Sequence, residues 1–117
     1  MDYNQILFAA FEVVVRAKGE KPIILDLREI TVITDYFLVT SAKNSIHLKA
    51  LADAVIEKME AHNITPQRIE GYQGTGWILL DYGFMVIHLL TKEEREFYRL
   101  EQLWHGAKIL TPTTFLA

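Results

Sequence analysis

Two long stretches of the chain repeat apolar residues at the spacing of a helix. In residues 3–18 the apolar positions recur every three or four residues and form one stripe, made of Tyr3, Ile6, Leu7, Ala10, Val13, Val14 and Ala17. Residues 44–63 repeat the pattern with Leu48, Leu51, Ala52, Val55, Ile56 and Met59. We expect Gly19 to cap the end of the first helix, before Pro22, and Asn44 or Ser45 to cap the start of the second.

Shorter apolar runs, rich in β-branched residues, predict the strands. They cover residues 22–27, 34–42, 66–72, 77–82 and 84–90. The last two runs predict a hairpin with a tight turn at Tyr82-Gly83.

A third helix is predicted over about residues 92–105, because Thr91 stands three residues before Glu94 in the spacing of a capping box. Its expected inner face carries Phe97, Leu100 and Trp104. The tail from residue 109 is apolar but irregular, and its pattern leaves open whether it docks or frays. The order αββαβββα predicts an α/β fold: one domain over residues 1–117, with helices packed on a single mixed sheet of about five strands.

The predicted hairpin places two kinds of side chain on opposite faces. Trp77, Leu79 and Asp81 share one face, and Ile78 and Leu80 share the other. The second pair is expected to be core. Tyr82, at the turn, is expected beside the first set. If no helix covers the outer face, it forms an exposed aromatic and aliphatic patch with an acidic rim. Such patches usually mark protein-binding interfaces. If helices cover both faces instead, Trp77 is core, and the pattern favours neither arrangement.

Composition narrows the choice of partners. The chain has 117 residues, half of them hydrophobic, and a net charge of −3 without a dense Lys/Arg cluster. These values disfavour direct RNA or DNA binding and suit a basic protein partner better. The N-terminus lacks the features of a signal peptide, and no apolar run is long enough to span a bilayer, so a cytoplasmic location is expected.

Candidate catalytic and ligand-binding residues form no recognisable set. With no cysteine, thiol chemistry is excluded, and the glycines at 71, 74 and 76 lack the strand-loop-helix context of a nucleotide loop. Asp26, Asp35 and Asp81 are imaginable magnesium ligands, but none has a second acid two positions away on its strand. We therefore expect no enzyme activity, metal or cofactor.

The four histidines also lack the spacing of a metal site. His88 is expected to be a packed or hydrogen-bonded structural residue, and His47 to be solvated.

Three stretches together resemble the Iojap family of ribosomal silencing factors. They are DYFLVTSAKNSIHLKALADAV, EGYQGTGWILLDYGFMVIHLL and REFYRLEQLWHGAKI, and the resemblance covers about residues 5–110. One departure is that the family's second strand commonly ends in Thr-Gly, whereas this chain has Thr40-Ser41-Ala42.

The resemblance implies a nucleotidyltransferase-like fold without catalytic residues. It also implies binding to the large ribosomal subunit through its protein number fourteen, which blocks subunit joining and represses translation under nutrient limitation. Several members form homodimers. The expected partner-binding residues are Trp77, Leu79, Asp81, Tyr82, Glu70 and Tyr98. Two alternatives remain: a nucleotidyltransferase-like enzyme that uses the three aspartates, and a structural homodimer.

Overall fold

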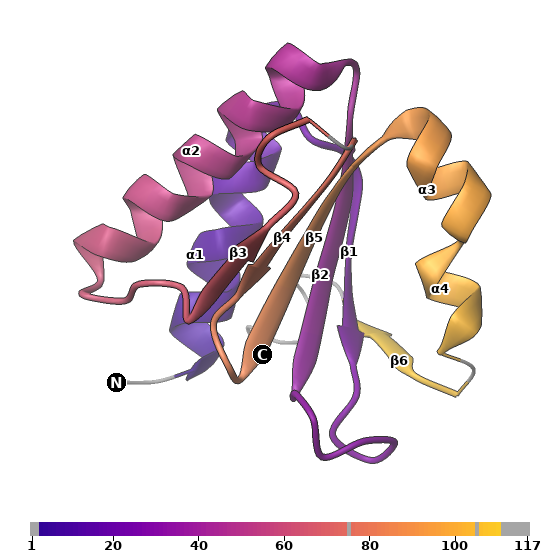
Figure 1. The fold of residues 1–117 in the computed structure, drawn as a ribbon. Helices are drawn as coiled ribbons and strands as arrows, with labels where there is room; N and C mark the ends of the chain where they lie inside the picture. The colour runs from indigo at the N-terminus through magenta and orange to yellow at the C-terminus, as the bar shows by residue number, and fades with distance from the viewer. Residues whose placement is uncertain (1–2, 75, 105, 111–117) are drawn as a thin grey trace.

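The computed structural model describes residues 3–74, 76–104 and 106–110. Its elements follow in the order α1 (Tyr3–Arg16), β1 (Glu20–Asp26), β2 (Tyr36–Ala42), α2 (Ser45–Ala61), β3 (Arg68–Glu70), β4 (Trp77–Asp81), β5 (Met85–Thr91), α3 (Lys92–Tyr98), α4 (Leu100–Leu103) and β6 (Lys108–Leu110). The predicted α/β class and the sheet with packed helices are confirmed (Figure 1).

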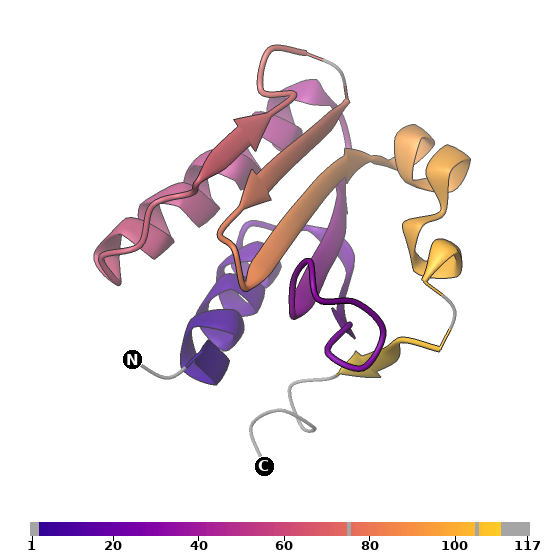
Figure 2. The same cartoon turned by 60° about the horizontal axis from the view of Figure 1, so that its bottom comes forward.

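The six strands form one mixed sheet in the order β3-β4-β5-β2-β1-β6. Its parallel pair is β2 and β5, and the other neighbouring strands are antiparallel. The sequence predicted about five strands, and the additional one is β6, which pairs with β1 at the edge of the sheet (Figure 2). The remainder of the tail, residues 111–117, lies outside the described residues.

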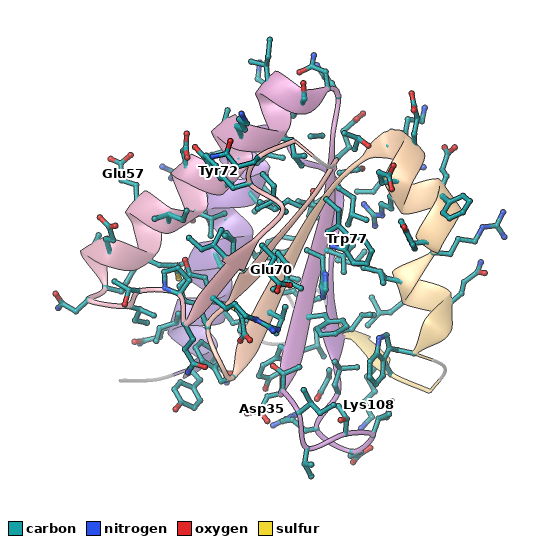
Figure 3. The ribbon with its side chains drawn as sticks, in the orientation of Figure 1. Asp35, Glu57, Glu70, Tyr72, Trp77 and Lys108 are labelled. Carbon is teal, nitrogen blue, oxygen red and sulfur yellow. The ribbon has the colours of Figure 1, made fainter. Side chains whose placement is uncertain are left out.

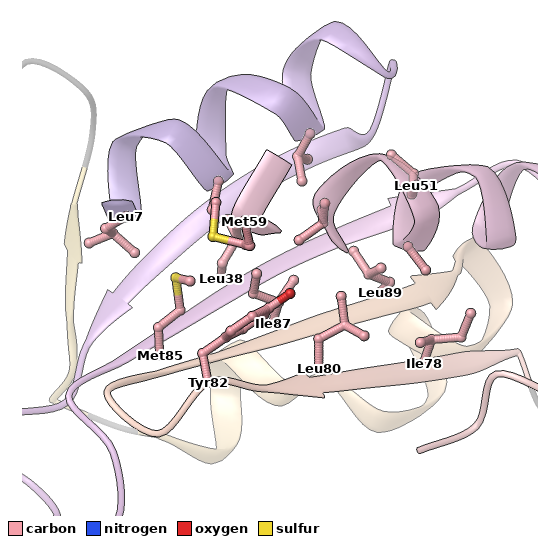
Figure 4. Close-up of a cluster of buried hydrophobic side chains, with 14 of the residues drawn as sticks. Leu7, Leu38, Leu51, Met59, Ile78, Leu80, Tyr82, Met85, Ile87 and Leu89 are labelled. Carbon is pink, nitrogen blue, oxygen red and sulfur yellow. The ribbon is translucent and has the colours of Figure 1, made fainter. Parts of the chain in front are cut away.

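Helices α1 and α2 pack on one face of the sheet, and α3 and α4 lie on the other side (Figure 1). The large core fills the space under α1 and α2 (Figure 4). Strand β4 has the predicted alternation: Ile78 and Leu80 are buried in this core, whereas Trp77 and Leu79 point to the other face and are half-buried. A second, smaller cluster on that face consists of Val39, Leu90 and Leu100, with Ile23, Phe37 and Trp77 packed against it.

The caps of the first two helices depart in one case from the prediction. Asn44 caps α2, since its side chain accepts a hydrogen bond from the backbone N–H of His47 at 2.8 Å. At the end of α1, however, Lys18 has the left-handed conformation (φ 67°) and Gly19 does not. Gly19 is required for space, because a Cβ there would lie 2.6 Å from Thr40 Oγ1 and 2.7 Å from Val14 Cγ1. The helix ends before Pro22, as predicted, and the chain continues directly into β1, which contains this proline.

The predicted last helix is broken. Arg99 takes a left-handed conformation (φ 49°) between α3 and α4, which turns α4 toward the second cluster. Leu100 is buried as predicted, and Trp104 packs edge-on against Phe37, with ring centroids 5.5 Å apart. Phe97 was wrongly placed on the inner face, since its side chain is 78% exposed.

Candidate protein-binding groove

A groove of about 400 Å³ lies between the β3–β4 hairpin and α3. Its lining consists of Glu70, Gly71, Trp77, Leu79, Glu94 and Tyr98. Four of the six residues predicted to bind a partner therefore meet at one place: Trp77, Leu79, Glu70 and Tyr98. Figure 3 shows Trp77 between the sheet and α3, with Glu70 at the neighbouring strand.

The hairpin positions the strand residues of the groove. Glu70 on β3 pairs with Leu79 on β4, so the carboxylate stands beside the aliphatic floor. Leu79 in turn pairs with His88 on β5. Because alternate residues of a strand share a face, Trp77 and Leu79 point the same way and form the apolar part of the groove.

Aromatic rings form a connected row across this side of the sheet. The rings of Trp77 and Tyr98 have centroids 4.7 Å apart, and Tyr98 also meets Phe97 at 5.0 Å. Trp77 donates a hydrogen bond from Nε1 to His88 Nδ1 at 3.2 Å, and Phe37 packs edge-on against the His88 ring at 4.4 Å. Tyr98 is 41% exposed, so the row runs from the buried sheet to the surface.

His88 fixes the orientation of Trp77, as expected for a structural histidine. Its side chain is only 4% exposed, and burial lowers its pKa to about 4. The ring is therefore neutral near pH 7, which lets Nδ1 accept the indole N–H. Among the described residues, Nε2 of His88 has no hydrogen-bond partner.

Glu94 lines the groove although the sequence indicated another role for it. The first half of the capping box is present, since Thr91 Oγ1 accepts from the Glu94 N–H at 3.4 Å. The Thr91 N–H, however, donates to Gly76 O at 2.8 Å, so the Glu94 carboxylate is not needed to close the box. Gly76 allows this approach, because it has a φ of 80° and a Cβ there would lie 3.0 Å from Glu94 Cγ.

Tyr82 and Asp81 lie away from this groove. The expected exposed position of Tyr82 is wrong: its side chain is 5% exposed and belongs to the large core under α1 and α2 (Figure 4). Asp81 points to the outer face, as predicted, but it is not part of the groove lining. Its carboxylate accepts from the Gly83 N–H at 2.8 Å and lies 3.6 Å from the Arg68 guanidinium.

Two of the three acids considered as metal ligands, Asp26 and Asp81, have separate partners. Asp26 binds Arg28 through two side-chain hydrogen bonds of 2.9 and 2.8 Å, and these bonds lower the pKa of Asp26. Asp81 is engaged as described above. In the part of the chain that the structure describes, no group of three His, Cys, Asp or Glu residues is arranged to hold a metal ion.

The remaining sequence expectations have mixed outcomes. His47 was expected to be solvated, but its Nε2 lies 2.9 Å from Ala17 O and its Nδ1 accepts from the Lys43 N–H at 3.0 Å. The glycine-rich segment connects β3 to β4, as its strand context indicated. None of the described helices is long and apolar enough to cross a membrane.

The fold and the groove define a small α/β protein whose outer sheet face carries a partly exposed row of aromatic rings between acidic side chains. Residues 1–115 match the family model described as ribosomal silencing factor during starvation, RsfS. The chain therefore belongs to the RsfS family, as its resemblance to Iojap proteins indicated.

Individual relatives agree with this assignment. A ribosomal silencing factor RsfS from Halalkalibacterium halodurans is 32% identical over 107 residues, which cover 92% of each chain. The Iojap-related mitochondrial protein of Arabidopsis thaliana is 29% identical and aligns over 68% of this chain and 46% of its own length. A crystal structure of a Chromobacterium violaceum protein matches with a TM-score of 0.86 and 30% identity, over 92% of this chain and 90% of that one.

Proposed function

We propose that this protein is a translational repressor that binds the large ribosomal subunit through the basic ribosomal protein numbered fourteen. Bound there, it blocks joining of the small subunit by occupying its space, and it slows translation when nutrients are limiting. It acts in the cytoplasm, without catalysis, metal or cofactor. Membership of the RsfS family supports the ribosomal part of this proposal.

The groove is the observation that supports the docking site. Interfaces combine an apolar, often aromatic centre with a polar rim. Trp77, Leu79 and Tyr98 provide such a centre, while Glu70 and Glu94 place two carboxylates in the same lining. Among the described residues, no lysine or arginine lines this groove, and the one cation paired with its acids is Arg68, 3.8 Å from Glu70 on β3, so the charge of the lining suits a basic partner.

Asp81 belongs to the outer part of this surface in the proposal. It stands on the Trp77 face of β4, next to Arg68. Tyr82 contributes only through the core beneath the hairpin, since its ring is buried.

Sedimentation tests the proposal. The purified protein should sediment with isolated large subunits and not with small subunits, and it should reduce the formation of joined ribosomes measured by light scattering. A protein that forms dimers and ignores large subunits would support the structural-homodimer alternative instead. Metal-dependent nucleotide turnover that disappears in Asp35→Asn would support the enzyme alternative.

A further inference from the structure

A second hollow, of about 360 Å³, lies on the other side of α3, against the paired start of β1 and end of β2. We call it the basic cleft. Four cationic residues line it, Lys21, Lys92, Arg95 and Arg99, against the two acids Glu20 and Glu96. This local excess of positive charge contrasts with the net charge of −3 for the whole chain.

Arginine side chains that bond to carbonyl and hydroxyl oxygens hold the walls of the cleft in place. Arg95 Nη1 donates to the Glu20 carbonyl at 3.0 Å and lies 3.4 Å from Ser41 Oγ, which ties α3 to the paired ends of β1 and β2. Arg99 Nε donates to the Glu96 carbonyl at 3.2 Å. The Arg99 contact fixes the guanidinium through an uncharged carbonyl oxygen, which leaves its positive charge in place.

The two lysines of the cleft are available to an external anion. Within the described part of the chain, Lys21 and Lys92 form no ion pair. Lys21 and Arg99 also hold left-handed backbone conformations, with φ of 45° and 49°. Such conformations are costly for residues other than glycine and are often found at functional sites.

We propose that the basic cleft binds a phosphate of the ribosomal RNA backbone beside the docked ribosomal protein. Helix α3 separates the two sites: Glu94 and Tyr98 line the groove, whereas Lys92 and Arg99 line the cleft. A ribosomal protein is surrounded by RNA, so a helix that meets the protein on one side brings its other side near phosphates. Guanidinium and ammonium groups are the usual phosphate ligands.

This inference rests on the proposed ribosomal function and replaces the expectation of little nucleic-acid contact. The negative net charge of the chain argues against binding RNA over a broad surface, but this argument does not exclude a phosphate contact at one cluster of cations. RNA contact is therefore confined to the cleft.

Salt dependence measures the number of phosphate contacts. Removing one cationic side chain that contacts a phosphate reduces the slope of log affinity against log salt concentration by about 1. The Lys92→Gln/Arg99→Gln double variant should therefore reduce the slope for large subunits by about 2, measured between about 50 and 200 mM KCl. Lys58→Gln, on α2 at the opposite face of the sheet, is the matched control and should keep the parent slope.

Two further measurements separate the cleft from the groove. Binding to the isolated ribosomal protein, without RNA, should be the same for the parent and the double variant. A short RNA duplex should shift the backbone amide NMR signals of the cleft in the parent but not in the double variant, and more than inorganic phosphate does at equal phosphate concentration.

The outcomes are distinct. If the protein binds large subunits but the double variant keeps the parent slope, or the RNA duplex leaves the cleft signals unmoved, the cleft proposal is wrong and the proposed function stands. If the double variant binds the isolated protein more weakly, the cleft contacts protein and not RNA. If the parent does not bind large subunits, the proposed function fails, and the RNA titration still decides whether the cleft binds phosphate.

Discussion

Replacement of Trp77 by alanine tests both roles of this side chain, in the packing of the fold and in partner binding. The side chain is half-buried: it packs against the cluster around Leu90, and its ring also lines the groove. Trp77→Ala should therefore weaken both the fold and partner binding. An exposed residue would affect only binding, and a core residue would affect mainly stability.

The loss of stability follows from these contacts. Truncation of a buried tryptophan costs about 3–5 kcal/mol, so a half-buried one should cost about 2 kcal/mol. The lost indole N–H leaves Nδ1 of the buried His88 without its donor, which adds about 1 kcal/mol. A total of about 3 kcal/mol should lower the Tm by roughly 12 °C for a chain of this size.

Partner binding should fall by about 2 kcal/mol or more, as for other aromatic anchors of interfaces. This corresponds to about 30-fold in Kd. Urea denaturation gives the stability, and co-sedimentation with large subunits gives the affinity at a temperature where the variant is folded. Trp77→Phe is the control, because it keeps a ring in the groove and loses the N–H.

Two results would refute this reasoning. A folded Trp77→Ala protein that binds as tightly as the parent would move the interface away from the Trp77 end of the groove, to Tyr98 and the exposed side of α3. A variant as stable as the parent would contradict the packing of Trp77 against His88 and the second cluster.

Four further predictions follow from single residues. Burial lowers the folded-state pKa of His88 to about 4, so the unfolded chain binds the proton at a higher pH than the folded chain does. The free energy of unfolding should therefore be full above about pH 6.5 and fall by up to about 3 kcal/mol toward pH 4. Urea titrations should show that His88→Gln removes this loss. Glu94→Gln should weaken binding to large subunits a few-fold and most at low salt, whereas Glu93→Gln, outside the groove lining, should not. Gly19→Ala should lower the free energy of unfolding by about 1–3 kcal/mol, because the added Cβ would meet close neighbours. Lys18→Gly should raise the free energy of unfolding by up to about 1 kcal/mol, because glycine adopts the positive φ without strain. A variant that melts at the parent's temperature would contradict the geometry described for its position.

The sequence predicted the elements whose periodicity is long and regular. The stripe of α2 and the alternation of β4 needed no tertiary information, because each buries one continuous face. The same alternation also carried the position of Tyr82, which has the parity of Ile78 and Leu80 and shares their core. Its position at a turn instead predicted exposure. The Asp81 carboxylate accepts from the Gly83 N–H, and the Tyr82 N–H donates to Met85 O, so the alternation of the strand continues to the turn and buries Tyr82.

Other features depend on contacts that are distant in sequence. Strand β6 has three residues and exists only as a partner of β1, so no local pattern marks it. Glu94 was visible only as part of a capping box, and its place in the groove depends on the bond between Thr91 and Gly76. The basic cleft joins residues from β1, β2, α3 and α4, which net charge and local clustering cannot reveal.

The break at Arg99 gives the groove its exposed aromatic edge. In a continuous helix, residues three apart lie on the same face, so burial of Leu100 would bury Phe97 as well. The left-handed Arg99 removes this coupling: Leu100 is 6% exposed in the second cluster, whereas Phe97 is 78% exposed. Tyr98 is left between Phe97 and the Trp77 ring. The residue that ends α3 thus also presents two aromatic rings beside the acidic groove, and its own guanidinium lines the basic cleft on the other side of the helix.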